Sequence, residues 1–393
     1  MMFLSDITRN ICRITICNSY CRIDRFFCKC GYKMKVSPQD SERIRAISFV
    51  CALMVVAIHC SSIPKGWWDG SCDMPAWIVG LQTFGTDTLS RLAVPWFFVV
   101  SGFFLVKGLD LSGAFGISGK TCCVLAWWKH SVLKRVLTLG VPYLLWNLIY
   151  YLFKLSTGKY SFDMWHCLEQ LTGCDFYDVP ACGQLWYLRC VFFYVLCAPV
   201  FVALFYGRVV GPVSIVALLF CWLVGIGLPI KYMQIVDFSY IMYFGVGVYF
   251  GLGDRGVGRW LQRLGFVPVV ILGITVVGVM FGSVFRNLQV YHVSSQIMII
   301  AGLPSLWVLG GGILALTSRW KRLYGLSFFV YAMHVILVSL IYKVVSRFMP
   351  PMAYESIGYI LKIVVGMLGS IAIGQLLGRF MPRVLRVLCG GRG

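Results

Sequence analysis

The feature that most constrains this chain is an almost wholly apolar run from Ile44 to Ser62. A helix of about 20 such residues is long enough to cross a lipid bilayer. The run carries one histidine, His59, near its end, within the stretch ALMVVAIHC. A histidine inside a membrane span is costly unless it has a partner or a function. We therefore take His59 as the first candidate for a catalytic residue.

The composition extends this interpretation to the whole chain. Of the 393 residues, 59% are hydrophobic and only 13% are charged, and the mean hydropathy is +0.80. A soluble domain carries about 25% charged residues, so this composition indicates an integral membrane protein. The 35 Lys and Arg residues, against 15 Asp and Glu, match the basic cytoplasmic loops of membrane proteins. We therefore expect the lipid bilayer, and no nucleic acid, as a partner.

The apolar runs predict an all-α, polytopic membrane protein of about ten transmembrane helices. The predicted spans are residues 44–62, 88–107, 135–155, 186–206, 209–228, 238–253, 265–283, 296–316, 324–345 and 357–378. Basic residues collect in alternate loops and acidic residues in the others. This alternation predicts that both termini are cytoplasmic.

Residues 1–33 differ from the rest, because they are basic and rich in cysteine and contain no long apolar run. We interpret them as an extension ahead of a functional protein that begins near Met34. The alternative is a small cytoplasmic metal-binding or redox appendage. Residues 34–393 form the membrane domain, with helices at about 44–378 and a short basic cytoplasmic tail.

The predicted outer loop 156–185 contains several cysteines. Disulfides form outside the cytoplasm. Cys174 and Cys182 enclose a proline that favours a turn, so we expect these two to pair, although other pairings are open.

Two further ionisable residues inside predicted spans are candidates for catalysis. Arg189 lies within the apolar run LWYLRCVFF of the fourth span, and His334 lies near the middle of the ninth. Such intramembrane residues are candidates for functional sites. The alternatives are an arginine that extends to the outer headgroups and a histidine that bonds structurally to another helix.

Basic residues at the inner ends of the spans are candidates for binding a substrate. Arg45 and His59 lie within about 40° of each other around a helix and could mark the two ends of one polar stripe. Lys134 and Arg135, at the inner start of the third span, suit the phosphates of a soluble donor. The alternative for all three basic residues is anchoring at the cytoplasmic surface.

Two positions in the second and fourth spans complete the candidate substrate contacts. Ser101 and Gly102 form a small pair in a bulky, aromatic helix. They could create a bend that makes room for an acyl chain, or they could allow close helix packing. Trp186 could contact substrate or belong to an interfacial aromatic belt.

These motifs together resemble the acyltransferase-3 family of membrane O-acyltransferases. The first span resembles the family in ALMVVAIHC, which includes His59, and the second in VPWFFVVSGFF. The third resembles it in KRVLTLGVPYLLWN, and the fourth in LWYLR at Leu185–Arg189. A late span resembles it in SFFVYAMH, which ends at His334. The resemblance covers roughly residues 44–378.

The chain departs from the family pattern at two positions. Ser48 stands eleven positions before His59, where the family usually has an arginine that contacts the donor. Arg45, one helical turn further inward, is the nearest arginine. Thr138 stands three positions after Arg135, where the family tends to have a second basic residue.

The resemblance implies an acyltransferase of the cytoplasmic (inner) membrane. It would transfer an acyl group, usually acetyl from acetyl-CoA, to a hydroxyl of a cell-envelope carbohydrate or glycolipid. His59 would act as general base or transient acyl carrier, and Arg189 would stabilise the oxyanion. We expect no metal and no cofactor other than the acyl-CoA donor. The alternatives are a proton-coupled transporter or flippase of an envelope precursor, and a non-catalytic acyltransferase-like protein.

Overall fold

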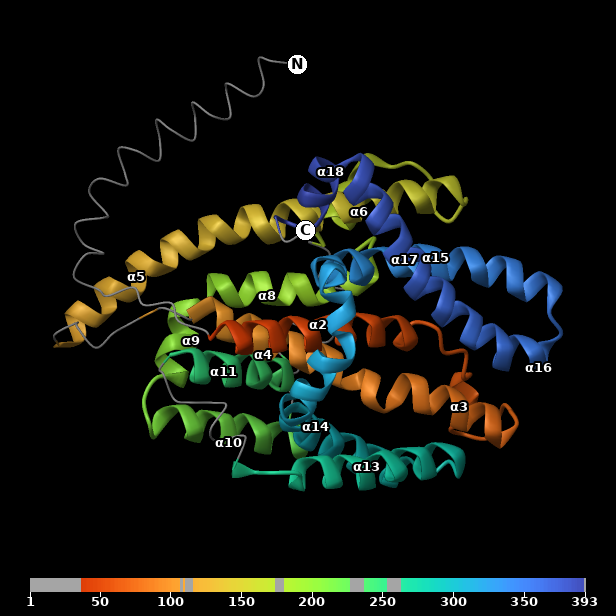
Figure 1. The fold of residues 1–393 in the computed structure, drawn as a ribbon, viewed down its shortest axis with the longest axis horizontal. Helices are drawn as coiled ribbons and strands as arrows, with labels where there is room; N and C mark the ends of the chain where they lie inside the picture. Colours follow the sequence, from red (N-terminus) through yellow and green to blue (C-terminus); the bar gives the residue numbers. More distant parts are fainter. Residues whose placement is uncertain are drawn as a thin grey trace, which may run out of the picture.

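The computed structural model describes residues 37–106, 109, 116–173, 180–226, 237–252 and 263–391. The predicted extension 1–33 lies outside these residues. Within the described part the chain is helical and contains no strand, which confirms the all-α prediction. The first helix, α2 (Pro38–Ile58), lies in the middle of the bundle, against α4 (Ala93–Val106), α14 (Leu288–Thr317) and α15 (Ser327–Phe348) (Figure 1).

Several helical stretches are long and apolar enough to cross a membrane. The described residues contain five of them: Ala76–Val106, Cys123–Ser156, Val267–Val284, Leu288–Phe348 and Pro351–Phe380. A sixth results if α8 (Trp186–Leu196) and α9 (Ala198–Phe205), at 75° to each other, form one span. The structure is therefore that of a multi-pass membrane protein, whereas ten crossings and cytoplasmic termini stay predictions.

One of these stretches, Leu288–Phe348, has 61 residues. A helix of that length would extend about 90 Å, roughly three times the thickness of the hydrocarbon core. It contains α14 and α15, joined by the short helix η6 (Ser318–Leu326), where Trp320 has a non-helical backbone. The stretch therefore has length enough for two crossings.

The remaining helices and turns fill the other described segments. The longer ones are α5 (Gly116–Arg135), α6 (Val141–Ser156), α10 (Val210–Leu223), α11 (Phe238–Gly251), α13 (Val267–Val284) and α17 (Tyr359–Phe380). The shorter ones are η1 (Lys65–Trp67), α7 (Met164–Thr172), η4 (Gly183–Leu185), α16 (Pro351–Ala353), η7 (Tyr354–Gly358) and α18 (Pro382–Leu388).

Local sequence explains where α2 begins and ends. The hydroxyl of Ser37 accepts a hydrogen bond from the backbone N–H of Asp40 at 3.0 Å, and Pro38 suits the first helical position. The helix ends at Ile58, so His59 is the capping residue that follows it. The helix therefore begins and ends earlier in the chain than the predicted span 44–62, and His59 directly follows its last residue.

The second predicted span, 88–107, also began too late. The chain is already helical from Ala76 in α3 (Ala76–Asp87), which continues through η2 (Leu89–Leu92) into α4. The two long helices are separated at Thr88, whose φ of −95° and ψ of −115° are not helical. The sequence hid α3 because its second half carries polar residues that interrupt the apolar run.

Close packing of α4 on α11 fixes this part of the bundle. A Cβ atom added to Gly102 would lie 2.1 Å from the backbone oxygen of Phe244. One added to Gly247 would lie 2.0 Å from the backbone oxygen of Val99. Only glycine fits such contacts. Since α4 runs unbroken through Ser101 and Gly102, the structure favours close packing over a bend.

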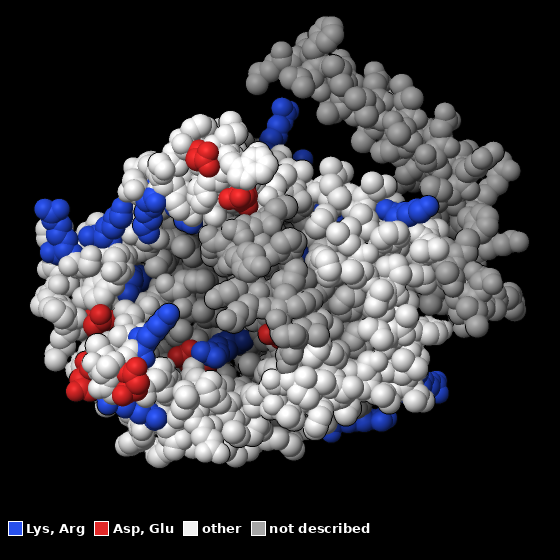
Figure 2. Space-filling model, turned by 180° about the vertical axis from the view of Figure 1, so that it is seen from behind, with Lys and Arg blue, Asp and Glu red and all other residues white. Residues whose placement is uncertain are grey.

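The surface fits a protein surrounded by lipid. Figure 2 shows broad surface areas without charged side chains, whereas many of the charged side chains on this face gather toward the left edge of the view. Many large apolar side chains of α10 and α13 are exposed, for example Phe220 and Ile274. A soluble monomer rarely exposes so much contiguous apolar surface.

Candidate active site

Two histidines from distant parts of the chain meet beside the end of α2. The ring centroids of His59 and His334 are 5.2 Å apart, with the ring planes tilted by 43°. His334, on α15, is completely buried, whereas His59 is exposed. Closer to the start of α2, the ring centroids of Phe49 and of Tyr324, in η6, lie 5.6 Å apart. These two contacts show that α2 and the η6–α15 stretch run parallel.

The hydrogen bonding of His334 determines which of its nitrogens is basic. Its Nδ1 lies 3.0 Å from the backbone oxygen of Val330. A carbonyl oxygen only accepts, so Nδ1 carries the proton and Nε2 is an acceptor. This Nε2 is buried and has no hydrogen-bond partner among the residues that the structure describes. A buried polar atom without a partner costs about 1–3 kcal/mol, and such atoms often have a functional reason.

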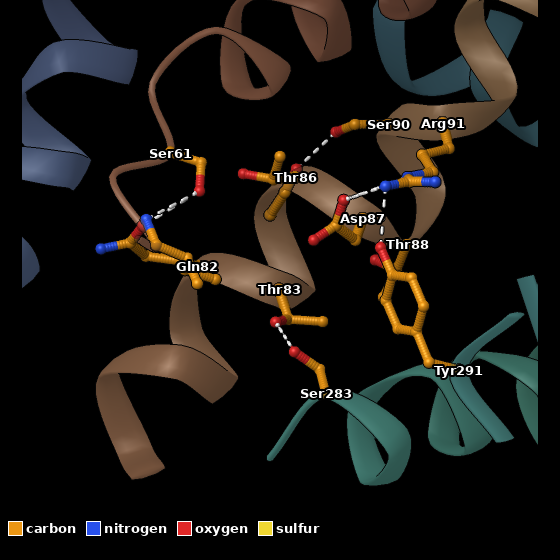
Figure 3. A network of polar contacts seen from close by, with 12 residues as sticks. Ser61, Gln82, Thr83, Thr86, Asp87, Thr88, Ser90, Arg91, Ser283 and Tyr291 are labelled. Atoms are coloured by element: carbon orange, nitrogen blue, oxygen red, sulfur yellow. Dashed lines mark hydrogen bonds and ion pairs between the residues drawn. The ribbon is translucent and has the colours of Figure 1, made fainter. Parts of the chain in front are cut away.

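A polar network centred on Gln82 lies next to His59 and ties α3 to the loop after α2. The side-chain oxygen of Gln82 accepts from the backbone N–H of Ser62 at 2.8 Å and from the hydroxyl of Ser61 at 3.2 Å. Its amide nitrogen donates to the backbone oxygen of Glu355 at 2.8 Å. Figure 3 shows Gln82 pointing from α3 toward Ser61. We call Gln82 and these partners the Gln82 network.

Two threonines of α3 complete the attachment of this helix. The hydroxyl of Thr86 donates to the backbone oxygen of Ala57 at 3.2 Å, two residues before His59, and lies 3.1 Å from the hydroxyl of Tyr359. The hydroxyls of Thr83 and Ser283 are 2.7 Å apart (Figure 3). The polar face of α3 therefore holds the end of α2 in position.

The same region contains a buried lysine that the sequence analysis missed. Lys362 of α17 is 2% exposed; its Nζ lies 3.4 Å from the hydroxyl of Tyr354 and 4.7 Å from the centre of that ring. The carboxylate of Glu355 accepts from the hydroxyl of Ser62. A lysine within the apolar run YILKIVVGMLG was the signal available in the sequence.

An ion pair at the break between α3 and α4 was also missed. Arg91 donates from Nη2 to Oδ1 of Asp87 at 2.7 Å and from Nε to the same oxygen at 3.0 Å. Nη2 also donates to the hydroxyl of Tyr291 at 2.7 Å (Figure 3). The polar stretch TDTLSR between two apolar segments was the available signal.

The structure places Arg189 against the end of α7. Its Nη1 donates to the backbone oxygen of Gly173 at 3.1 Å. Gly173 has a φ of +66° and caps α7 in the left-handed conformation that glycine favours. A catalytic role for Arg189 stays a prediction.

The two candidate donor contacts on α2 differ in their surroundings. Ser48 stands where the family usually has an arginine. Its hydroxyl accepts a hydrogen bond from Nε1 of Trp96 at 3.1 Å. Arg45 is exposed. Arg43 lies closer to the bundle, with its guanidinium 5.2 Å from the ring centre of Trp307.

The candidates on α4 and α8 join an aromatic cluster. The hydroxyls of Ser101 and Tyr187 lie 2.6 Å apart. Trp186 is half-buried, with its ring centroid 5.0 Å from that of Tyr240 and 6.2 Å from that of Phe98. Trp186 therefore packs on neighbouring helices.

Lys134 and Arg135 are the last two residues of α5, which continues through the π-helical turn η3 (Val136–Gly140) into α6. The predicted third span, 135–155, thus begins within a much longer helical stretch. Lys134 is exposed, and its role in donor binding stays a prediction.

The expected disulfide receives no support. Cys182 is buried and is a free thiol, and its backbone N–H donates to the side-chain oxygen of Asn147 at 2.8 Å. Cys174 lies outside the described residues.

The fold and these contacts define a multi-pass helical membrane protein with a histidine pair at a polar helix junction. The sequence model of the acyltransferase-3 family, described as an acyltransferase domain, matches residues 43–379. Since the match covers most of the chain, the chain belongs to this family and is a membrane acyltransferase. No curated protein and no solved structure matches it.

Proposed function

We propose that this acyltransferase moves an acyl group, usually acetyl, from cytoplasmic acyl-CoA to a hydroxyl of a cell-envelope carbohydrate or glycolipid. The contact between His59 and His334 carries the proposal. It places an exposed imidazole beside a buried one whose Nε2 is an acceptor without a partner in the described structure. A general base needs such an arrangement, with one nitrogen directed at the reacting hydroxyl and the other held in place.

In the proposed step, the acceptor hydroxyl attacks the thioester carbonyl carbon and gives its proton to His59. The carbon–sulfur bond breaks, and the CoA thiolate takes that proton from the imidazolium. Nε2 of His334 would accept the other N–H of His59 and so fix which His59 nitrogen is basic. Catalytic hydrogen bonds of this kind often shorten only when substrate is bound. A covalent acyl-histidine at His59 is the second route.

The proposed topology supplies a donor side and an acceptor side. CoA is polyanionic and cytoplasmic, so Lys134, Arg135, Arg45 and the position of Ser48 would face it from the inner side. The acceptor would approach from the outer side, where the loop after α2 carries Asp69. Arg189 would supply the always-charged donor for the oxyanion, as proposed from the sequence.

The test uses the purified full-length protein with radiolabelled acetyl-CoA and envelope glycans from the producing cells. We expect label to enter glycan only when protein and glycan are both present. In cells, mass analysis should show acylated glycan only when the gene is intact. Absence of thioester cleavage and of glycan labelling by well-folded protein would contradict the proposal.

A further inference from the structure

The ion pair of Asp87 and Arg91 lies where a charged pair is least expected. It occurs near the middle of the 31-residue candidate span Ala76–Val106, beside the non-helical residue Thr88. Its side chains are nevertheless 41% exposed at Arg91 and 16% at Asp87. Charges and broken helices are tolerated at membrane depth where they are buried in protein or line a water-filled space. Since this pair is partly exposed, we infer that it lines such a space.

The pair retains hydrogen-bonding capacity on both partners. Arg91 uses Nε and Nη2, and Asp87 uses Oδ1. The carboxylate of Asp87 also interacts with the hydroxyl of Tyr291, whereas Nη1 of Arg91 has no hydrogen-bond partner within the described part of the chain. A carboxylate accepts several hydrogen bonds, and a sugar hydroxyl both accepts and donates, so it can accept from Nη1 of Arg91 while it donates to Asp87.

Aromatic rings lie beside Arg91. Tyr291 bonds to Arg91, and its ring centroid lies 4.7 Å from that of Trp68, which belongs to the loop after α2. Tyr240, near enough to Arg91 to interact with it electrostatically, lies 5.0 Å from Trp186. Aromatic walls with a few oriented polar groups are typical of sites for small molecules. The combination suits a ring with an apolar face and polar hydroxyls.

The ion pair is also linked to the end of α2, which His59 follows, through a neighbouring residue. Asp87 directly follows Thr86, whose hydroxyl bonds to the backbone oxygen of Ala57, two residues before His59. The ion pair therefore begins one residue away from a direct contact between α3 and the end of α2. A ligand held at Asp87 and Arg91 would lie near the helix end that His59 follows.

We propose that Asp87 and Arg91 form the subsite that binds the carbohydrate acceptor through its hydroxyl groups. The proposal rests on the proposed function, because it names where the acceptor of that reaction is held. The pair positions the acceptor, while His59 takes the proton.

The test compares Asp87→Asn and Arg91→Lys with wild type, in detergent, with radiolabelled acetyl-CoA. Two acceptor fractions of the producing cells are used separately: water-soluble polysaccharide and organic-solvent extract containing lipid-linked saccharide. The fraction that is labelled identifies the source of the acceptor. For that fraction, the half-saturating concentration should rise about ten- to a hundredfold, the range of a lost charge-assisted hydrogen bond. The maximal rate and the acceptor-independent hydrolysis of acetyl-CoA should change little.

A second Asp–Arg pair provides matched controls. Asp73 and Arg286 form an ion pair in the loop region, where the Asp73 side chain is 89% exposed. Asp73→Asn and Arg286→Lys should leave the half-saturating acceptor concentration unchanged. Unchanged acceptor dependence in the Asp87 and Arg91 variants, or equal losses of transfer, hydrolysis and melting temperature, would overturn the subsite. A wild-type protein that labels neither fraction would overturn the proposed function, and the subsite with it.

Discussion

The histidine pair and the Gln82 network lie on either side of the end of α2, yet their hydrogen bonding differs. In the Gln82 network, both ends of the amide are bonded, to Ser62 and to Glu355. In the histidine pair, Nε2 of His334 is buried and has no partner in the described structure. Satisfied buried networks make a fold rigid, whereas an unsatisfied group lowers stability. The comparison favours a structural role for Gln82, whereas the chemical role of the histidines stays a prediction.

The largest expected effect is that of His59→Ala. Removing a general base should lower acyl transfer about 10²- to 10⁴-fold, while membrane abundance stays normal because the side chain is exposed. Transfer per molecule is measured with radiolabelled acetyl-CoA, and abundance by quantitative blotting. Normal transfer at normal abundance would remove His59 from the mechanism. A loss of abundance would show instead that His59 has a structural role, like Gln82.

Arg189→Lys tests whether the chemical region extends beyond the histidine pair. Lysine keeps the charge but loses the planar fork and is more strongly hydrated. If Arg189 stabilises the oxyanion, the activation free energy should rise by about 2.7–4 kcal/mol, as for other lost oxyanion donors. We expect this loss in single-turnover transfer at matched expression. Near-wild-type turnover would instead assign Arg189 a structural role, to which its bond with Gly173 contributes.

Gln82→Leu should damage stability more than chemistry. Leucine leaves the backbone N–H of Ser62 and the backbone oxygen of Glu355 without their partner, which costs about 1–3 kcal/mol. The melting temperature in detergent should fall, and the transfer rate of the remaining folded protein should change less than in His59→Ala. An unchanged melting temperature would remove the distinction between the two regions.

His334→Leu should have the smallest effect on stability. The substitution removes the unpaired acceptor Nε2 together with the bond from Nδ1 to the backbone oxygen of Val330, so its net cost should be about 1 kcal/mol. Transfer should fall because His59 loses its orienting partner. Melting temperature and transfer rate are measured on the same preparation. A large drop in melting temperature would show that His334 is a structural histidine.

Much of the fold was predictable because lipid imposes simple rules on sequence. Apolar runs predicted the helical class, and every predicted span contains helix in the described structure. The span 88–107 was misjudged because α3 carries Gln82, Thr83 and Thr86, whose partners lie in other segments of the chain. Its last residue, Asp87, pairs with Arg91 of η2. Polarity alone gives no sign that such partners exist.

The sequence by itself determined the membrane class, the helices, the family and the candidate histidines, since these depend on residue type and order. Only the tertiary structure decided that His59 contacts His334, because most of the chain separates α2 from α15 in the sequence. It also decided that Gln82 bonds to Glu355, 273 residues away, and that Arg91 bonds to Tyr291, 200 residues away. The physical reason is that hydrogen-bond partners across helices depend on packing, which places residues together independently of their distance along the chain.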